Sequence, residues 1–111
     1  MKKILTIAFA FLVIFGCATS MKTTAEADFR KNHHHHWPGY TFADFNKGKE
    51  LYVINCGGCH PLHKPYEFTE QQWSNILQKM IEKAKLGESE KELIFRYLMT
   101  ERELASAEKA N

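Results

Sequence analysis

Apolar residues recur at the 3.6-residue spacing of an α-helix over three stretches of the chain. The first stretch begins at about Phe42 or Asp44 and leads to residue 56. Thr41 and Asp44 resemble a capping box, in which a hydroxyl and an acid three residues later satisfy free backbone N–H groups. The apolar face consists of Phe45, Gly48, Leu51 and Tyr52. Because a glycine inside a helix costs about 1 kcal/mol relative to alanine, we expect Gly48 to make room for a crossing helix.

The second and third stretches lie in the C-terminal half of the chain. The second begins at Thr69, which forms a capping box with Gln72, and Gly87 is the expected C′ residue at its end. Its apolar positions are Trp73, Ile76, Leu77, Met80 and Ala84. The third begins at Ser89, with Glu92 completing another capping box. Its apolar face is Leu93, Ile94, Tyr97 and Leu98. We therefore predict an all-α domain of about three helices.

The limits of this domain follow from the segments around the helices. Residues 61–68 contain two prolines and no periodicity, which predicts a loop. The third helix is expected to end near Glu103, so that the domain spans 41–105 and residues 106–111 form a polar tail. A domain of about 65 residues is near the lower limit for a self-sufficient hydrophobic core.

Residues 1–16 have the pattern of an export signal. Two lysines near the start precede a run of twelve uncharged apolar residues, which is shorter than the about 20 that span a membrane and fits a secretory signal. The run ends in Ile-Phe-Gly-Cys, which resembles a bacterial lipobox in which Cys17 receives lipid and becomes the new N-terminus. Ordinary cleavage near residues 18–20, which would leave a soluble protein, is the alternative.

Residues 17–40 are polar, small and weakly patterned, and they predict a tether between the anchor and the domain. Four consecutive histidines, His33, His34, His35 and His36, can bind Ni²⁺, Cu²⁺ or Zn²⁺ weakly. We expect them to form an exposed loop with incidental metal affinity. The net charge of +2 equals the contribution of the two lysines in the signal, so the remaining chain has no basic excess for a nucleic-acid partner.

The most specific chemistry lies in Cys56, Cys59 and His60, which form a C-x-x-C-H motif typical of covalent haem attachment. Two thiols three positions apart can reach both vinyl groups of one porphyrin, and His60 is then placed to ligate the iron. The two intervening glycines add no bulk between the sulfurs. We expect a backbone carbonyl near Pro65 to accept the other ring N–H of His60. Because such attachment takes place outside the bacterial cytoplasm, an export signal supports this interpretation.

Other interpretations of the motif are weaker. A zinc site needs four ligands, and the third cysteine of the chain is the distant Cys17. A thioredoxin-like pair needs a βαβ framework, for which the sequence has no convincing strand. A disulfide between Cys56 and Cys59 would close a small strained ring and leave His60 unexplained. In the loop that follows, we expect Leu62, Tyr66 and Phe68 to wall the haem and His63 to lie on the surface or beside a propionate.

These features together resemble a class I, mono-haem cytochrome c, over about residues 42–100. The matching elements are the Gly48 and Tyr52 face, the C-x-x-C-H motif directly after it, and the Leu93, Tyr97 and Leu98 face. In that family the first and last helices cross near perpendicularly, and a methionine usually ligates the far side of the iron. Met80 is our expected ligand. Met99, no protein ligand and a histidine remain as alternatives.

The resemblance implies a covalent haem c with His60 and Met80 as axial ligands, which suits one-electron transfer. We therefore expect an electron carrier rather than an enzyme, with transient redox-protein partners and a lipid anchor at Cys17. Alanine rather than aspartate at position 18 indicates the outer membrane, on the periplasmic side. The alternatives are a haem-based sensor or small-ligand module with an open sixth site, and a haem subunit of a larger oxidoreductase complex.

Overall fold

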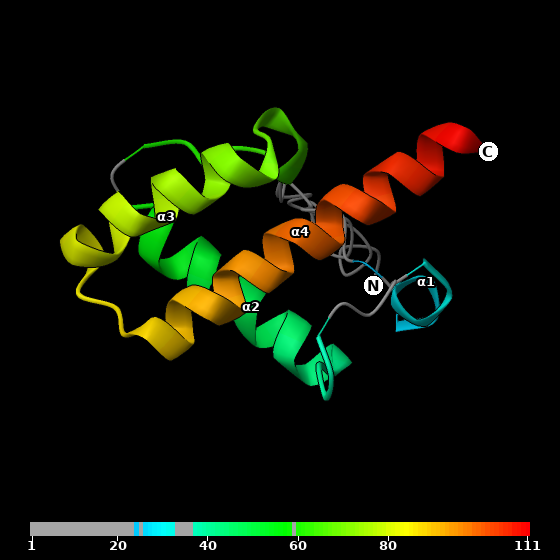
Figure 1. The fold of residues 1–111 in the computed structure, drawn as a ribbon, viewed down its shortest axis with the longest axis horizontal. Helices are drawn as coiled ribbons and strands as arrows, with labels where there is room; N and C mark the ends of the chain where they lie inside the picture. Colours follow the sequence, from blue (N-terminus) through cyan, green and yellow to red (C-terminus); the bar gives the residue numbers. More distant parts are fainter. Residues whose placement is uncertain (1–23, 25, 33–36, 59) are drawn as a thin grey trace, which may run out of the picture.

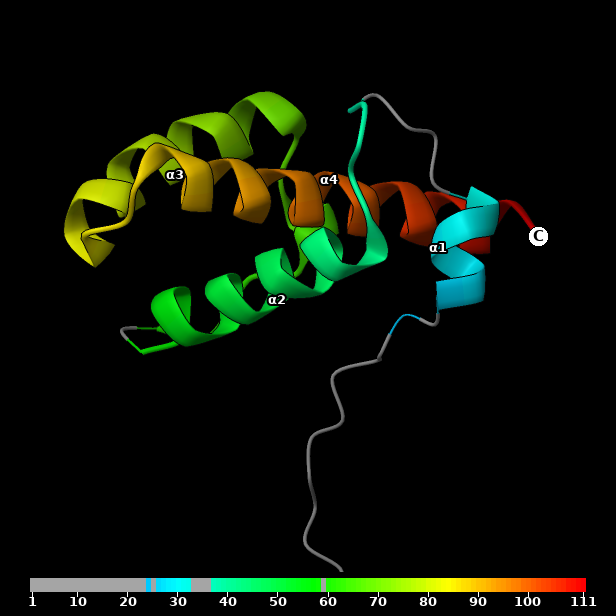
Figure 2. The ribbon, with the colours of Figure 1, turned by 90° about the horizontal axis from the view of Figure 1, so that it is seen from below.

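The computed structural model describes residues 24, 26–32, 37–58 and 60–111, and the regular elements of that part of the chain are all helical. They are α1 (Glu26–Asn32), α2 (Phe42–Cys56), the short 3₁₀-helix η1 (Pro65–Glu67), α3 (Glu70–Ala84) and α4 (Glu88–Ala110). α2 and α4 cross and make the most extensive helix–helix contact (Figure 1), while α3 lies on the opposite side of α4 from α2 in the view of Figure 2. The predicted all-α class is confirmed for the described residues.

Two of the three predicted capping boxes are confirmed. At the start of α2, the Asp44 N–H donates to Thr41 Oγ1 at 3.2 Å, and the Thr41 N–H donates to Asp44 Oδ2 at 2.9 Å. Hydrogen bonds from the Thr41 hydroxyl and backbone N–H hold the pKa of Asp44 below its usual value. Thr69 and Gln72 make the same reciprocal pair at the start of α3, at 3.2 and 2.9 Å. These side chains act locally, and the sequence is therefore sufficient to locate both helix starts.

The turn between α3 and α4 differs from the prediction. Gly87 is the N-cap of α4 rather than the C′ residue of α3, and Glu90, not Glu92, accepts the N–H of the cap residue, at 2.9 Å. Ser89 lies inside the helix. The left-handed residue that ends α3 is Lys85, with φ 55° and ψ 42°. The prediction for this turn was wrong because glycine is favoured both after the C-terminus of a helix and at the N-cap of the next one. Here α3 ends three residues before Gly87, and α4 begins directly after it.

The left-handed conformation of Lys85 leads to a prediction about the stability of the protein. A residue with a Cβ is strained there by about 1–2 kcal/mol, whereas glycine is not. After the entropy lost by ordering a glycine, we expect Lys85→Gly to raise the free energy of unfolding by about 0.5–1 kcal/mol in chemical denaturation. Lys85→Ala removes the same charge but keeps the strain, and it should give no gain. An equal gain in both variants would contradict this explanation.

The crossing of α2 and α4 forms around Gly48. A Cβ at this position would clash with the carbonyl oxygen of Leu93 and lie 2.8 Å from Tyr97 Cβ. Tyr52, one turn further on, packs with ring centroids 6.0 Å from both Tyr97 and Trp73. The most deeply buried side chains of the core are Phe45, Trp73, Ile94, Leu98 and Thr100. Gly48 thus makes room for the crossing helix, as its place on the apolar face of the sequence predicted.

α1 corrects the prediction of a tether over residues 17–40 for its own part of that range, 26–32, whereas residues 17–23 lie outside the described residues. Phe29 on this helix is only 3% exposed, and its ring lies 6.0, 5.4 and 5.3 Å from the rings of Tyr40, Phe42 and Phe45, respectively. Tyr40 is also buried, and the Arg96 guanidinium of α4 lies 5.8 Å from its ring centroid. A helix of seven residues is not stable alone, so burial of these aromatic rings holds it.

The C-terminal end of α4 extends beyond the predicted limit. The helix continues to Ala110, so the segment 106–111, which we expected to be a polar tail, belongs almost entirely to it. This last part contains two Ala, one Glu and one Lys, which have high helix propensity, and it has no apolar stripe. Among the described residues, no helix is both long and apolar enough to cross a membrane.

Candidate functional site

A cavity of about 270 Å³ lies where the C-terminal end of α2 meets α3 and the first half of α4. It brings together three of the residues that the sequence singled out, Cys56, His60 and Met80. The rest of its wall is Asn55, Leu77, Ile81, Lys83, Ala84, Leu86 and Ile94. The cavity thus combines a thiol, an imidazole and a thioether with a mostly aliphatic wall, which is the usual character of a cofactor pocket.

Cys56 is the last residue of α2, and its side chain is half-buried at the cavity. Burial raises the pKa of the Cys56 thiol, so the group stays protonated and weakly reactive at neutral pH. Gly57 caps the helix by donating its N–H to Val53 O at 3.3 Å, and a Cβ here would lie 2.7 Å from that same oxygen. A Cβ at Gly58 would meet nothing within 4 Å. Cys59 lies outside the described residues.

His60 lies at the exposed rim of the cavity. Its Nδ1 is 2.8 Å from the carbonyl oxygen of Pro61. In the tautomer that donates this hydrogen bond, Nε2 is the nitrogen left to bind a metal. The carbonyl of Pro65, near which we expected the acceptor to lie, instead accepts the indole N–H of Trp73 at 2.7 Å. That prediction was wrong because proximity of a proline in the sequence does not define which carbonyl faces the imidazole.

Met80 lies on α3, one turn before Ala84 and one turn after Leu77, and all three side chains line the cavity. Met99, the alternative sulfur ligand, is 7% exposed within the core between α4 and its neighbours. The structure therefore brings Met80, and not Met99, to the cavity that Cys56 and His60 share. The four histidines at 33–36 and Cys17 lie outside the described residues.

The loop after the motif is held by hydrogen bonds and by a row of rings. The Tyr52 hydroxyl donates to the carbonyl of His63 at 2.7 Å, and His63 Nδ1 lies 2.9 Å from Glu67 Oε2. Ring centroids are 5.4 Å apart for His60 and His63, 4.9 Å for His63 and Phe68, and 5.1 Å for Phe68 and Trp73. The Glu67 pKa is lowered, chiefly by its hydrogen bond with His63. This network orients the loop that carries His60, and His63 is exposed, as expected.

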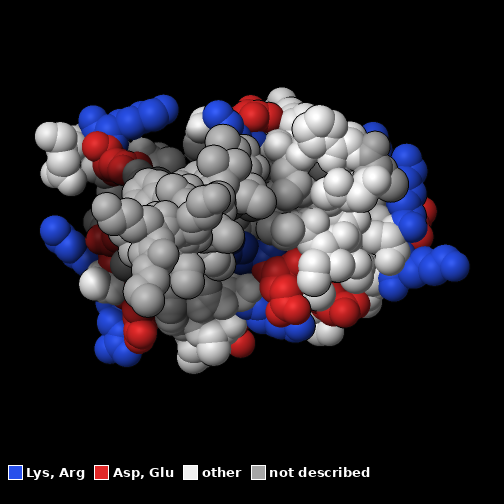
Figure 3. Space-filling model, turned by 180° about the vertical axis from the view of Figure 1, so that it is seen from behind, with Lys and Arg blue, Asp and Glu red and all other residues white. Residues whose placement is uncertain are grey.

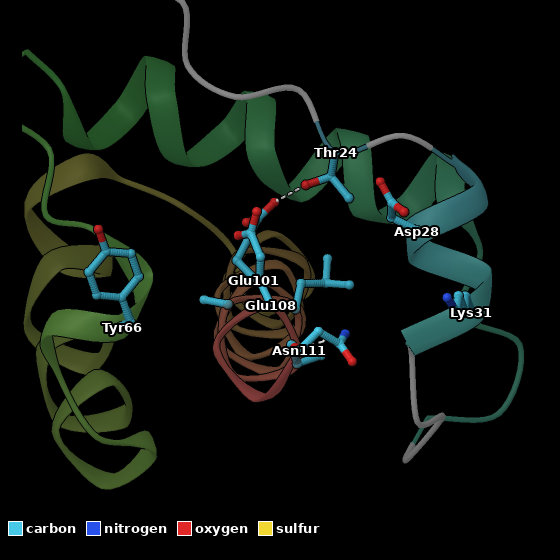
Figure 4. Close-up of a pocket in the computed structure, with 10 residues that line it drawn as sticks. Thr24, Asp28, Lys31, Tyr66, Glu101, Glu108 and Asn111 are labelled. Carbon is cyan, nitrogen blue, oxygen red and sulfur yellow. Dashed lines mark hydrogen bonds between the residues drawn. The ribbon is translucent and has the colours of Figure 1, made fainter.

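The three loop residues that we expected to surround the haem do not line the cavity. Leu62 and Phe68 pack against the core, and Tyr66 is 53% exposed on the side of the second half of α4. There Tyr66 lines a separate pocket of about 560 Å³ with Thr24, Asp28 and Glu101 (Figure 4). Sequence reasoning missed four residues at the cavity, which are Asn55, Ile81, Lys83 and Leu86. Lys83 was within reach of prediction, because it lies three residues after Met80 on the same helix.

The thiol, the imidazole and the thioether at the cavity are groups that could hold a haem. The cavity volume is slightly below the about 300–1,000 Å³ of typical ligand pockets, and the cavity is open at the rim that carries His60. Among the described residues, which do not include Cys59, there is no group of three or more metal-ligating side chains and no strand.

The described surface carries charges of both signs (Figure 3). On the face shown in Figure 3, Lys and Arg lie mostly toward the edges and acidic side chains lie between them, while much of the described surface is uncharged. That face therefore offers no continuous basic patch in its described part. The chain matches no known family model, and comparisons with curated proteins and with solved structures find no significant match.

Proposed function

We propose that this chain is an exported c-type cytochrome that carries single electrons between redox partners, with a fold similar to that of class I cytochromes c. The observation that supports this most is that Met80, twenty residues after the motif, lines the same cavity as Cys56 and His60 of the motif. The C-x-x-C-H motif and the crossing of α2 and α4 around Gly48 support it further.

Each residue at the cavity has a distinct proposed role. Cys56 and Cys59 would form the thioethers, His60 would ligate the iron through Nε2, and Met80 would supply the second protein ligand. The Pro61 carbonyl orients the His60 ring and strengthens it as a ligand by accepting its other N–H. A haem bound in this way supplies reversible one-electron oxidation and reduction. The aliphatic side chains of α3 and α4 exclude water from one side of the site.

The location and the partners follow from the N-terminal sequence and the charge. We propose that Cys17 is lipidated and that the protein faces the periplasm from the outer membrane. The partners are other redox proteins, which bind through small transient interfaces at the open rim of the cavity. A balanced charge outside the signal gives no support for a nucleic-acid partner.

Replacing Met80 tests the sixth ligand and separates a carrier from a sensor. We expect the reduced native protein to show no spectral change with carbon monoxide. Met80→Ala should bind carbon monoxide and lower the reduction potential by on the order of 0.1–0.3 V, a part of the range that axial ligands span. The matched control is Met99→Leu, which changes a core methionine. Rapid binding of carbon monoxide by the native protein would contradict the carrier and favour a haem-based sensor.

A further inference from the structure

The chain joins the folded domain earlier than its sequence indicates, at Thr24. Thr24 Oγ1 donates a hydrogen bond to Glu101 Oε1 of α4 at 2.8 Å (Figure 4). Two residues later α1 begins, and its Phe29 is buried against the aromatic rings that lead into α2. Thr24, the first residue that the structure describes, is thus already attached to the domain.

This early docking shortens the connection between the proposed lipid site and the domain. Seven peptide links separate Cys17 from Thr24, and a fully extended chain of that length reaches about 25 Å. If the tether continued to residue 41, as the sequence pattern indicated, the same estimate would give about 85 Å. The docking of α1 therefore reduces the maximum reach about threefold.

Thr24 is attached to α4, the helix that also lines the cavity, but at a point further along that helix. Ile94 of α4 lines the cavity, and Glu101, which holds Thr24, is seven residues or about 10 Å further along the helix. α1 and the C-terminus lie together at one end of the molecule, and the turn between α3 and α4 lies at the other (Figure 1). The end that carries α1 is therefore nearer to an N-terminal anchor than the cavity is.

The charge of this end does not favour adsorption to a lipid surface. The pocket between α1 and α4 is lined by side chains of both signs, with Asp28, Glu101 and Glu108 beside Lys31 (Figure 4). Attraction to anionic lipids requires a cluster of basic residues, which this pocket lacks. The length of the covalent tether, rather than adsorption, then sets the distance of the domain from the bilayer.

We propose that the docking of α1 shortens the tether, so that the α1 end of the domain is held within about 25 Å of the lipid surface and the haem cavity lies closer to the bilayer than a tether reaching residue 41 would allow. This rests on the proposed function, because it requires lipid at Cys17 and haem at the cavity. A redox partner would then meet the cavity close to the same membrane, and long excursions of the domain would not occur.

The test uses the full, lipidated and haem-loaded protein in phosphatidylcholine vesicles that contain a lipid with a fluorescent headgroup. Haem quenches this fluorescence by energy transfer, and the quenching falls steeply with distance. A variant with 18 Gly and Ser residues inserted between positions 23 and 24 adds up to about 60 Å of reach without changing the core. We expect the native protein to quench at least twofold more strongly than this variant. Equal quenching would overturn the proposal.

Two substitutions on α1 test whether its docking is the cause. Phe29→Asp should release α1 and move the quenching toward that of the insertion variant. Ala27→Asp introduces the same charge at an exposed position of the same helix and should behave as the native protein does. Loss of haem absorbance or of the lipid mass would contradict the proposed function itself, and both are measured separately from the quenching.

Trypsin cleavage tests the docking of α1 without haem-dependent or lipid-dependent readouts. Cleavage after Arg30 and Lys31 in α1 should be slow in the native protein and at least tenfold faster in Phe29→Asp. Cleavage after Arg96 in α4 reports unfolding of the whole domain and should change much less. Rapid cleavage after Arg30 and Lys31 in the native protein would show that α1 is not docked, and the proposal would then be wrong.

Discussion

Replacing both Cys56 and Cys59 with serine is expected to abolish covalent haem attachment. The haem-stained band of a denaturing gel should disappear completely, because no thioether can form to either vinyl group. Cys17→Ser is the matched control, since it removes a cysteine outside the motif and should leave the staining intact. A haem-stained band that persists in the double variant would contradict the proposed function.

The same variant should also lose most of its stability. A dry cavity of about 270 Å³ would cost up to about 6 kcal/mol, judged from cavity-forming substitutions in other proteins, and water at the open rim lowers this figure. Small domains have only about 5–15 kcal/mol in total. We therefore expect the haem-free chain to unfold at much lower denaturant concentration than the haem-loaded protein, as measured by circular dichroism.

Gly48→Ala is the second substitution with a large expected effect. The added Cβ would meet the Leu93 carbonyl oxygen and Tyr97 Cβ. The first is a backbone atom and the second is bonded directly to the backbone, so neither can rotate away. The helices would have to separate, at a cost of about 2–3 kcal/mol or more. This outweighs the gain of about 1 kcal/mol from the higher helix propensity of alanine.

Chemical denaturation of the haem-loaded protein measures this effect. Asn46→Ala is the control, because Asn46 is exposed on the same helix and its substitution should leave the stability nearly unchanged. If Gly48→Ala were as stable as the control, the close crossing of α2 and α4 could not be what requires a glycine at this position.

The features that the sequence predicted correctly are those that depend on neighbours within one or two helical turns. Thr41 with Asp44, and Thr69 with Gln72, form their capping boxes from residues three positions apart. Met80 falls on the apolar stripe of α3, and that stripe faces the cavity. Helical periodicity is sufficient for such predictions because it defines a face without knowledge of what covers it.

The features that were mispredicted depend on contacts between distant segments. Phe29 is a single apolar residue in a polar stretch, and only its contacts with Phe42 and Phe45 make α1 part of the domain. Tyr66 was expected at the haem but lies beside the second half of α4, because the helix extends to Ala110 and offers it a surface there. Such contacts between distant residues cannot be predicted from a local sequence pattern.

The sequence by itself determined that this chain has a C-x-x-C-H motif, an all-α domain, and helix faces that carry Gly48 and Met80. Only the tertiary structure decided that Cys56, His60 and Met80 line one cavity, that the Pro61 carbonyl faces the His60 ring, and that Thr24 and α1 pack against the domain. The physical reason is that backbone periodicity and capping act over a few residues, whereas burial selects partners by shape from the whole chain.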